Sequence, residues 1–179
     1  MKKRFKLCAV LMAAAMAVSM SMTACGDSDS DTDDEDETPK YEQPIENYVR
    51  AINKGDGKAL EKCFPDFQVE YYSKKDDDYL DEYAEELNED MQDDFGEDFK
   101  ISYKVNEKEE LDEDDIESYT SKLENYTDDK ETEIKLTEGY KIKTTFKVKG
   151  SEVDSGNDEE KATYIVGKVN GKWVILDMR

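Results

Sequence analysis

The stretch ATYIVGKVNGKWVILDM, residues 162–178, carries the clearest fold signal in the chain. Two runs rich in β-branched residues flank Asn170 and Gly171, and Asn-Gly favours a two-residue type I′ turn between antiparallel strands. The stretch therefore predicts a β-hairpin. Its turn sets the register, with two predicted pairs at the loop end: Val169 opposite Lys172, and Lys168 opposite Trp173.

Alternation along this hairpin places apolar side chains on both faces of the predicted sheet. One face carries Ile165, Val169, Val174, Leu176 and Met178, and the other carries Tyr164, Val166, Trp173 and Ile175. A hairpin with one side in water would show a single apolar face. We therefore expect either a curled sheet that is covered on both sides, or a second face that meets a partner, including a homodimer through the sheet face.

A second alternating run lies upstream of the hairpin. From 134 to 148 the even positions are Ile, Leu, Glu, Tyr, Ile, Thr, Phe and Val, which predicts a strand with one face in the core. Gly139 marks a bend or the true start of this strand, and Glu138 shares the inward parity. The odd positions include Lys135, Lys141, Lys143 and Lys147, a lysine ladder typical of a solvated face or of protection against edge pairing. Residues 99–105 also alternate and predict another strand.

Helical periodicity precedes and separates these strands. We expect a helix over 43–53 that ends at Gly55, and a short helix that follows an Asp56 N-cap and ends at Pro65. Its apolar face includes Cys63, which we interpret as a small core residue. A short extended piece is predicted over 67–71, and a capping box at Ser73 predicts the start of a long helix with apolar residues at 79, 83, 87, 91 and 95. A last helix begins after Asp112, with Ile116, Tyr119, Leu123 and Tyr126 on one face.

The composition excludes several kinds of chemistry. The 179 residues include 47 acids, 25 bases and no histidine, for a net charge of −22. Catalysis by Ser-His-Asp or Cys-His groups and histidine-ligated zinc are therefore excluded. The negative charge repels nucleic acid, because phosphate contacts supply most of that affinity. We expect no cofactor, no metal site and no nucleic-acid partner.

Acids are concentrated in the long helix. Between Asp76 and Asp98 there are thirteen acids and no base. A solvated helix face accounts for this run. The alternative is binding of divalent cations or of a cationic partner, and the calcium-loop pattern fails in the other acidic tract, where positions six and twelve from Asp27 are Thr32 and Thr38.

The first 40 residues point to the cell envelope. Four bases in residues 1–6 precede an uncharged run, residues 7–24, which is typical of a secretory leader. Met22-Thr23-Ala24-Cys25 resembles the lipobox of bacterial lipoproteins, in which the cysteine is acylated and the leader is cut before it. The resemblance implies a signal peptide over 1–24, lipidation at Cys25, and an extracytoplasmic protein that is anchored to the membrane. The alternative is an ordinary secretory signal with an incidental cysteine.

Residues 25–40 read as an acidic tether, because like charges repel and no apolar residue is available for burial. From Gly26 to Pro44 the chain could reach at most roughly 60 Å. Residues 41–179 then form a single α+β domain. Cys8 lies in the leader, so the domain holds Cys63 alone and cannot form an internal disulfide.

The order of elements and four segments carry a resemblance. ENYVRAINKGDGKALEKCF, ISYKVNEKEELDEDDIESY, EGYKIKTTFKVKG and NGKWVIL are similar to segments of Firmicutes lipoproteins with uncharacterised domains. The arrangement resembles the nuclear transport factor 2-like, cystatin-like fold, which implies helices wrapped by a curved, cone-shaped antiparallel sheet. The resemblance transfers no catalytic residue.

Three functions remain open at this point. The first is a non-catalytic binding or accessory module at the envelope, for an unidentified protein or small-molecule ligand. The second is an enzyme of the ketosteroid-isomerase kind, with Tyr and an acid in an apolar pocket, and the third is a charged spacer that buffers cations. The side chains expected to line a cone or an interface are Tyr79, Tyr83, Tyr103, Tyr119, Tyr140 and Trp173.

Overall fold

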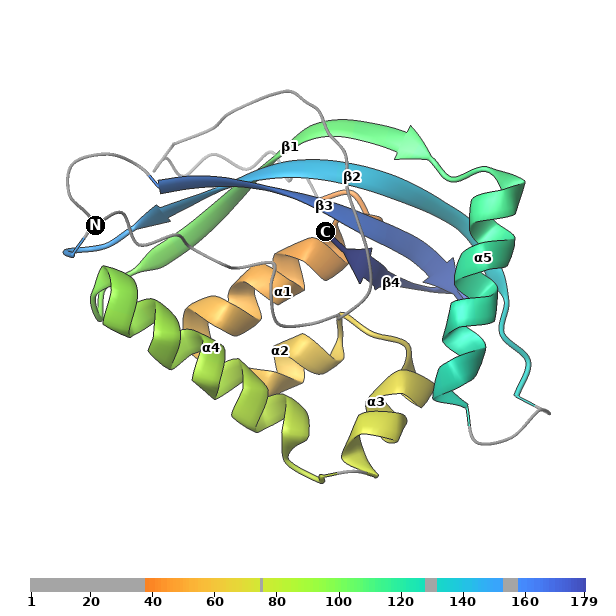
Figure 1. The fold of residues 1–179 in the computed structure, drawn as a ribbon, viewed down its shortest axis with the longest axis horizontal. Helices are drawn as coiled ribbons and strands as arrows, with labels where there is room; N and C mark the ends of the chain where they lie inside the picture. The colour runs from red at the N-terminus through yellow and green to blue at the C-terminus, as the bar shows by residue number, and fades with distance from the viewer. Residues whose placement is uncertain (1–37, 75, 128–131, 153–157) are drawn as a thin grey trace, which may run out of the picture.

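The computed structural model describes residues 38–74, 76–127, 132–152 and 158–179. Its fold is mixed α+β, and the sheet is antiparallel, in the strand order β1-β2-β3-β4, and not closed. The elements are α1 (Gln43–Lys54), α2 (Gly57–Glu61), α3 (Asp66–Ser73), α4 (Tyr79–Phe95), β1 (Lys100–Glu110), α5 (Glu113–Leu123), the 3-10 turn η1 (Glu124–Tyr126), β2 (Leu136–Lys149), β3 (Asp158–Val169) and β4 (Lys172–Met178). The sheet arches over α1, α2 and α4, and α5 stands at one end (Figure 1).

The hairpin prediction is confirmed in its turn and in its register. Asn170 and Gly171 have φ values of 50° and 87°, as a type I′ turn requires. Val169 pairs with Lys172 and Lys168 pairs with Trp173. Asn170 also ties the turn to the start of β2, because its side-chain oxygen accepts a hydrogen bond from the Lys135 amide at 2.9 Å.

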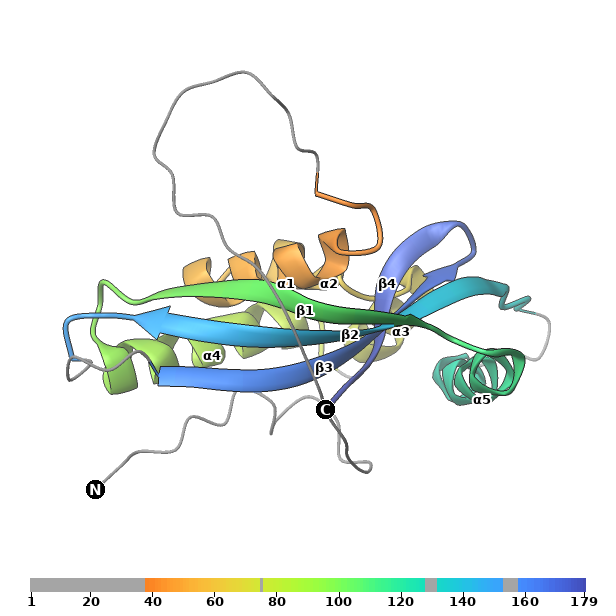
Figure 2. The same cartoon turned by 90° about the horizontal axis from the view of Figure 1, so that it is seen from above.

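Both faces of the hairpin are buried within the chain, as expected for a sheet that is covered on both sides. Tyr164, Val166 and Ile175 belong to the main core, together with α1, α2 and α4. Ile165, Val169, Val174 and Leu176 belong to a second core with Tyr119 and Leu123 of α5. Figure 2 shows α5 at one end of the sheet, apart from α1 and α2.

One hairpin residue lies on the opposite face from the one expected. Met178 packs against the main core rather than the second core. The register shifts between Ile165 and Val166, so that Tyr164 pairs with Met178. A bulge of this kind reverses the parity of every later residue on the strand.

The prediction that Gly139 marks a bend is confirmed, and the bend changes the face of the strand. The register shifts between Leu136 and Gly139. Beyond the shift, Ile142, Phe146 and Val148 point into the main core, whereas Leu136 before it joins the second core. The even positions from 134 to 148 therefore serve two cores rather than one.

The lysine ladder of β2 is not the guard of an edge strand, because β2 lies between β1 and β3. Three of its lysines form ion pairs with glutamates of the neighbouring strands. Lys143 contacts Glu107 at 2.7 Å, Lys141 contacts Glu109 at 3.7 Å, and Lys147 contacts Glu159 at 2.7 Å. β1 extends to Glu110, beyond the predicted 99–105, because its polar end pairs with β2 as far as Tyr140.

Residues 66–73 form a helix, so the predicted extended piece over 67–71 is wrong. The Gln68 and Val69 amides both donate to the Pro65 carbonyl, which starts the helix locally. The predicted capping box at Ser73 is also wrong, since α4 follows Asp78 and has no side-chain cap. Tyr126 lies in η1, past the end of α5, and not on the buried face of that helix.

Three of the remaining helix boundaries follow the sequence signals, whereas α2 ends at Glu61 and not at Pro65 as predicted. Gly55 takes the left-handed conformation at the end of α1, with φ of 60°. The Asp56 and Asp112 carboxylates accept the amides of Ala59 and Asp115 and cap α2 and α5. α2 and α4 approach closely at Gly57, where an added Cβ would lie 2.5 Å from the Asp81 Cα.

We predict that Gly171→Ala lowers the free energy of unfolding by about 1–2 kcal/mol, because a Cβ disfavours the left-handed region. Nothing lies within 4 Å of the position that the Cβ would take, so strain and not a clash would be measured. Gly171→Asn should recover most of the loss, since asparagine tolerates positive φ. Urea unfolding curves measure both, and equal losses in the two variants would contradict the turn assignment.

Candidate functional site

The predicted lipidation site cannot be placed, because Met22, Thr23, Ala24 and Cys25 lie outside the described residues. The six aromatic residues predicted to line a cone or an interface lie in four different places. Tyr79 and Tyr83 lie on α4, Tyr140 and Trp173 meet across the sheet, Tyr103 lies over the main core, and Tyr119 lies on α5. The structure does not bring them together in one pocket.

The largest group of aromatic side chains is a tyrosine surface made by Tyr71, Tyr72, Tyr79, Tyr83 and Tyr126. It joins α3, α4 and η1. The Tyr72 and Tyr79 rings stack at 5.3 Å between centroids, and Tyr79 and Tyr83 lie almost parallel at 6.4 Å. Tyr126 meets the Tyr71 ring edge-on at 5.4 Å. Tyr79 is 38% exposed, and so the surface reaches solvent.

Sequence reasoning did not predict three members of this group. The extended piece predicted over 67–71 included Tyr71, no element was predicted for Tyr72, and Tyr126 was predicted on the apolar face of the last helix. Gln68, which is 1% exposed, lies beneath the surface and donates to the Tyr72 hydroxyl at 3.4 Å. The helical start at Pro65 is the sequence signal that could have placed Tyr71 and Tyr72 on a helix, α3.

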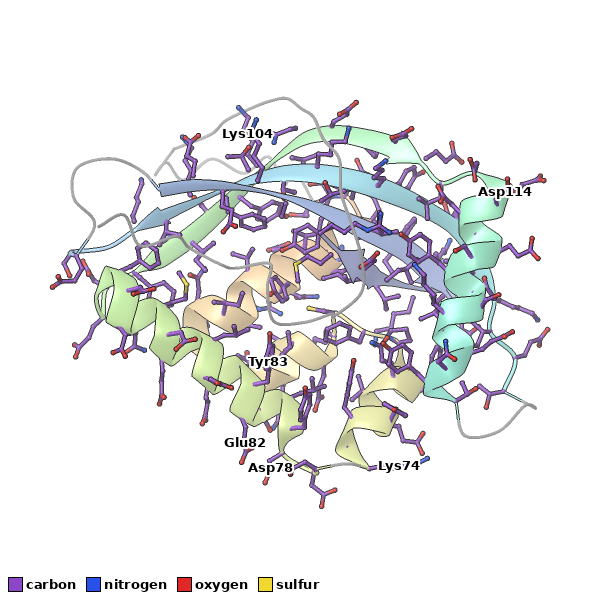
Figure 3. All side chains as sticks on the ribbon, in the orientation of Figure 1. Lys74, Asp78, Glu82, Tyr83, Lys104 and Asp114 are labelled. Carbon is purple, nitrogen blue, oxygen red and sulfur yellow. The ribbon has the colours of Figure 1, made fainter. Side chains whose placement is uncertain are left out.

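Two hydroxyls of the tyrosine surface, those of Tyr83 and Tyr126, have raised pKa values, and exposed acids of α4 lie next to it in sequence. Burial, and then the neighbouring hydroxyl of Tyr72, raises the pKa of Tyr126 to about 12. Burial also raises the pKa of Tyr83, with smaller contributions from Tyr79 and Glu86. Asp78 and Glu82 project from the start of α4 beside Tyr83 (Figure 3). Aromatic faces and carboxylates together suit a positively charged ligand.

A second aromatic group fastens the start of the folded region to the sheet. The Tyr140 and Trp173 rings stack at 5.7 Å, and the Tyr41 ring lies 5.0 Å from that of Tyr140. The Lys108 ammonium covers the group, 4.3 Å from the Tyr41 centroid and 4.7 Å from the Tyr140 centroid. A cation of the chain itself therefore occupies these ring faces, and the arrangement is that of a structural clamp.

Tyr103 and Cys63 pack in or against the main core, which accounts for both residues. Tyr103 packs on Phe146 at 6.1 Å, and burial raises its pKa, with further contributions from Glu42 and Glu46. Cys63 is fully buried, as predicted, and its thiol lies 3.4 Å from the Pro44 carbonyl oxygen. Burial raises the pKa of this thiol, so it is not an activated nucleophile.

A buried polar cluster at the end of β4 was missed by sequence reasoning. Asp177 is 4% exposed, although it follows the apolar run WVIL and continues the same strand. Its Oδ2 atom accepts the Arg179 Nε at 2.9 Å and the Tyr119 hydroxyl at 3.4 Å, and its Oδ1 atom accepts the Met178 amide at 2.9 Å. The sequence signal for this cluster was the acid Asp177 at the end of the apolar run WVIL.

Asp177 is buried and accepts hydrogen bonds on both oxygens from groups of the chain itself, an arrangement that suits cross-linking of neighbouring elements. Arg179 also donates to the Tyr119 hydroxyl at 2.8 Å, which links the end of β4 to α5. Glu138, the other inward acid considered, pairs with Lys168 at 2.7 Å and is partly exposed.

Comparisons with known proteins returned no matching family model, no matching curated protein and no matching solved structure. Among the described residues, no group of three or more His, Cys, Asp or Glu side chains could hold a metal ion. In the same part of the chain, every helix is too short or too polar to span a membrane.

We predict that the free energy of unfolding falls as pH rises from about 10 to about 12. Burial, followed by the charge of Asp177, raises the pKa of Tyr119 to about 12, and the pKa of Tyr126 is raised equally. Above pH 10 the unfolded chain releases these protons and the folded chain keeps them, so unfolding becomes easier. The double variant Tyr119→Phe/Tyr126→Phe should show a flatter profile in urea unfolding across this window. A profile as steep as that of the parent chain would show that other groups cause the loss.

Proposed function

We propose that this protein is an extracytoplasmic lipoprotein, anchored to the cell membrane through Cys25, whose domain is a non-catalytic binding or accessory module. The observation that carries the proposal is Met22-Thr23-Ala24-Cys25, at the boundary between an uncharged leader and an acidic tract. A thiol at this place, preceded by small residues, is what acylation requires. Two or more acyl chains would hold the protein stably at the membrane.

The position of Tyr41 supports a tethered domain. Residues 25–40 would form the tether, and Tyr41 follows directly. Its ring lies against Tyr140 and Trp173, under the Lys108 ammonium. The first residue of the domain is therefore fixed to the sheet, at the point where the tether would arrive. Movement of the tether would then leave the helices and the tyrosine surface undisturbed.

We also propose that the domain belongs to the nuclear transport factor 2-like, cystatin-like group. Helices that precede and cover one face of a bent antiparallel sheet support the proposal, as does the bulged long strand β2. An experimentally determined structure that aligns with that group over the whole sheet would test it.

A binding role is preferred to the ketosteroid-isomerase alternative because the buried acid, Asp177, already accepts hydrogen bonds from groups of the chain itself. A catalytic base needs a carboxylate oxygen that can accept a proton from the substrate. The Asp177 oxygens already accept from Arg179, Tyr119 and the Met178 amide. The predicted pocket tyrosines are also divided among separate groups.

The tyrosine surface is the candidate contact of this module, and its charge favours a cationic partner. α4 carries exposed acids on its outer side, and Tyr79 exposes part of its ring beside them. A lysine or arginine side chain could approach a ring and a carboxylate at once, which strengthens cation–π contacts.

Cys25→Ala should abolish incorporation of labelled fatty acid and should move the protein from the membrane fraction to the soluble fraction. Cys63→Ala is the matched control, because Cys63 is buried in the domain core and should play no part in anchoring. Labelled fatty acid that persists in Cys25→Ala, or is lost in Cys63→Ala alone, would contradict the proposed anchor.

Tyr79→Ala and Glu82→Gln should each weaken the binding of a lysine-rich peptide by about threefold to tenfold, consistent with one cation–π or ion-pair contact. The control is Glu113→Gln, which removes an exposed acid from the first turn of another helix, α5. Fluorescence anisotropy of a labelled peptide measures the affinities. An equal loss in Glu113→Gln would show a general charge effect and no specific contact at the tyrosine surface.

A further inference from the structure

The face of the sheet opposite α1, α2 and α4 carries a cluster of lysines, although the whole chain has a net charge of −22. The register places its members in neighbouring rows on the same side of β1, β2 and β3. We call this the lysine face, and it consists of Lys100, Lys104, Lys147, Lys149 and Lys161. Figure 3 shows Lys104 projecting from the top of the sheet, away from Asp78 and Glu82 at the bottom.

Three cross-strand rows make up the lysine face. In the first, Lys100 is opposite Lys149. The second row contains Ser102, Lys147 and Glu159, and the third contains Lys104, Thr145 and Lys161. Neighbouring rows are about 7 Å apart along a strand, and neighbouring strands are about 4.8 Å apart. The face is therefore a narrow strip of ammonium groups with two hydroxyls between them.

The lysines of this face are mostly not neutralised by acids of the chain. Within the described residues, an ion pair is seen for Lys147, with Glu159, but not for Lys100, Lys104, Lys149 or Lys161. The hydrogen bond from Lys147, with the charges of Lys147, Lys104 and Lys161, lowers the pKa of Glu159. One carboxylate is thus surrounded by three ammonium groups, and the strip has a positive potential of its own.

The opposite charges of the domain lie on opposite sides of the core. α4 lies under the sheet (Figure 1), and Lys104 of the lysine face projects above the sheet while Glu82 of α4 lies below it (Figure 3). At physiological salt the Debye length is about 8 Å, so that a partner at the lysine face is largely screened from α4. The net charge of the whole chain therefore does not determine the potential that a partner meets at the lysine face.

Acids at the two ends of the strip favour a partner that is narrow enough to lie on the lysines between them. At one end the exposed acids Glu97, Asp98 and Glu152 border it, and the Asp98 carboxylate accepts the Ser151 amide at 2.8 Å. At the other end Glu107 and Glu109 are paired with Lys143 and Lys141. An anionic membrane pressed flat on the sheet would meet these acids, whereas a single extended chain could lie on the three rows, whose one acid is Glu159.

The chemistry of the strip favours phosphate groups without bases. The outward side chains of the three rows are lysine, serine, threonine and one glutamate, with no aromatic ring on which a base could stack. Lysine binds phosphate as a point charge and does not need the two-pronged geometry that arginine offers. Ser102 and Thr145 place hydroxyl groups between the charges; the Ser102 hydroxyl donates to the Lys147 carbonyl at 3.5 Å, and the Thr145 hydroxyl accepts from the Asn106 side-chain amide at 2.7 Å.

We propose that the lysine face binds a linear polyanion, a polymer that carries phosphate groups along an extended chain and has no nucleobases. The polymer lies over the three rows and so contacts β1, β2 and β3. Its phosphates replace Glu159 as the partners of the surrounding lysines. This site is separate from the tyrosine surface and does not depend on the lipid anchor.

The test is binding of short-chain inorganic polyphosphate to the full-length protein in neutral detergent, measured by calorimetry at several salt concentrations. Lys104→Gln/Lys161→Gln should lower the affinity about tenfold and reduce the salt slope by about 1.4, the value for two phosphate contacts on a flexible strand. Glu159→Gln should instead raise the affinity, because it removes the acid that competes with the phosphates.

The control is Lys54→Gln/Lys58→Gln, which removes the same charge from exposed lysines of α1 and α2. Equal losses in the two double variants, or a weaker affinity of Glu159→Gln, would overturn the proposal. Tighter binding of anionic vesicles or of a single-stranded oligonucleotide than of polyphosphate would also overturn it, in favour of a membrane or a nucleic acid. Failure of polyphosphate binding leaves fatty-acid labelling of Cys25 unaffected, so the two proposals fail independently.

Discussion

The structure depends on one constraint, which is that the β3–β4 hairpin is apolar on both faces. Val166 and Ile175 need cover on one side, and Val169 and Val174 need it on the other. Burying a side chain of this kind stabilises the fold by about 1.5–3 kcal/mol, so an open face would cost several kcal/mol. The helical layer covers the first face and α5 covers the second. The bulges in β2 and β4 adjust the strands to these two covers.

The same constraint determines which surfaces remain available for recognition. α5 covers only the end of the sheet that contains the hairpin turn, so the other end of that face keeps its lysines in solvent. On the opposite side, α1, α2 and α4 enclose the main core, and α3 and η1 bring tyrosines to the margin of α4. Acidic and basic surfaces are thereby separated by the core, which provides two sites of opposite charge on one domain.

Sequence reasoning predicted the features that depend on local signals. The Asn-Gly turn, the Asp56 and Asp112 caps, the bend at Gly139 and the burial of Cys63 were all readable from short segments. Features set by tertiary pairing were not readable. The polar half of β1 is a strand because β2 pairs with it, and Met178 changes face because a bulge at Leu176 precedes it in β4. The tyrosine surface was missed in part for the same reason, since Tyr72 and Tyr126 meet only in three dimensions.

Hydrogen exchange of the native protein tests the two-sided burial of the hairpin most directly. The amides of Val166, Gly167, Val174 and Ile175 should exchange most slowly of all, and only when the whole domain unfolds. The amides of α5 should exchange faster, through local opening that exposes one face of the hairpin. Hairpin amides that exchange as fast as those of α5 or α3 would contradict the account, because the hairpin would then not be the element on which the rest of the fold depends.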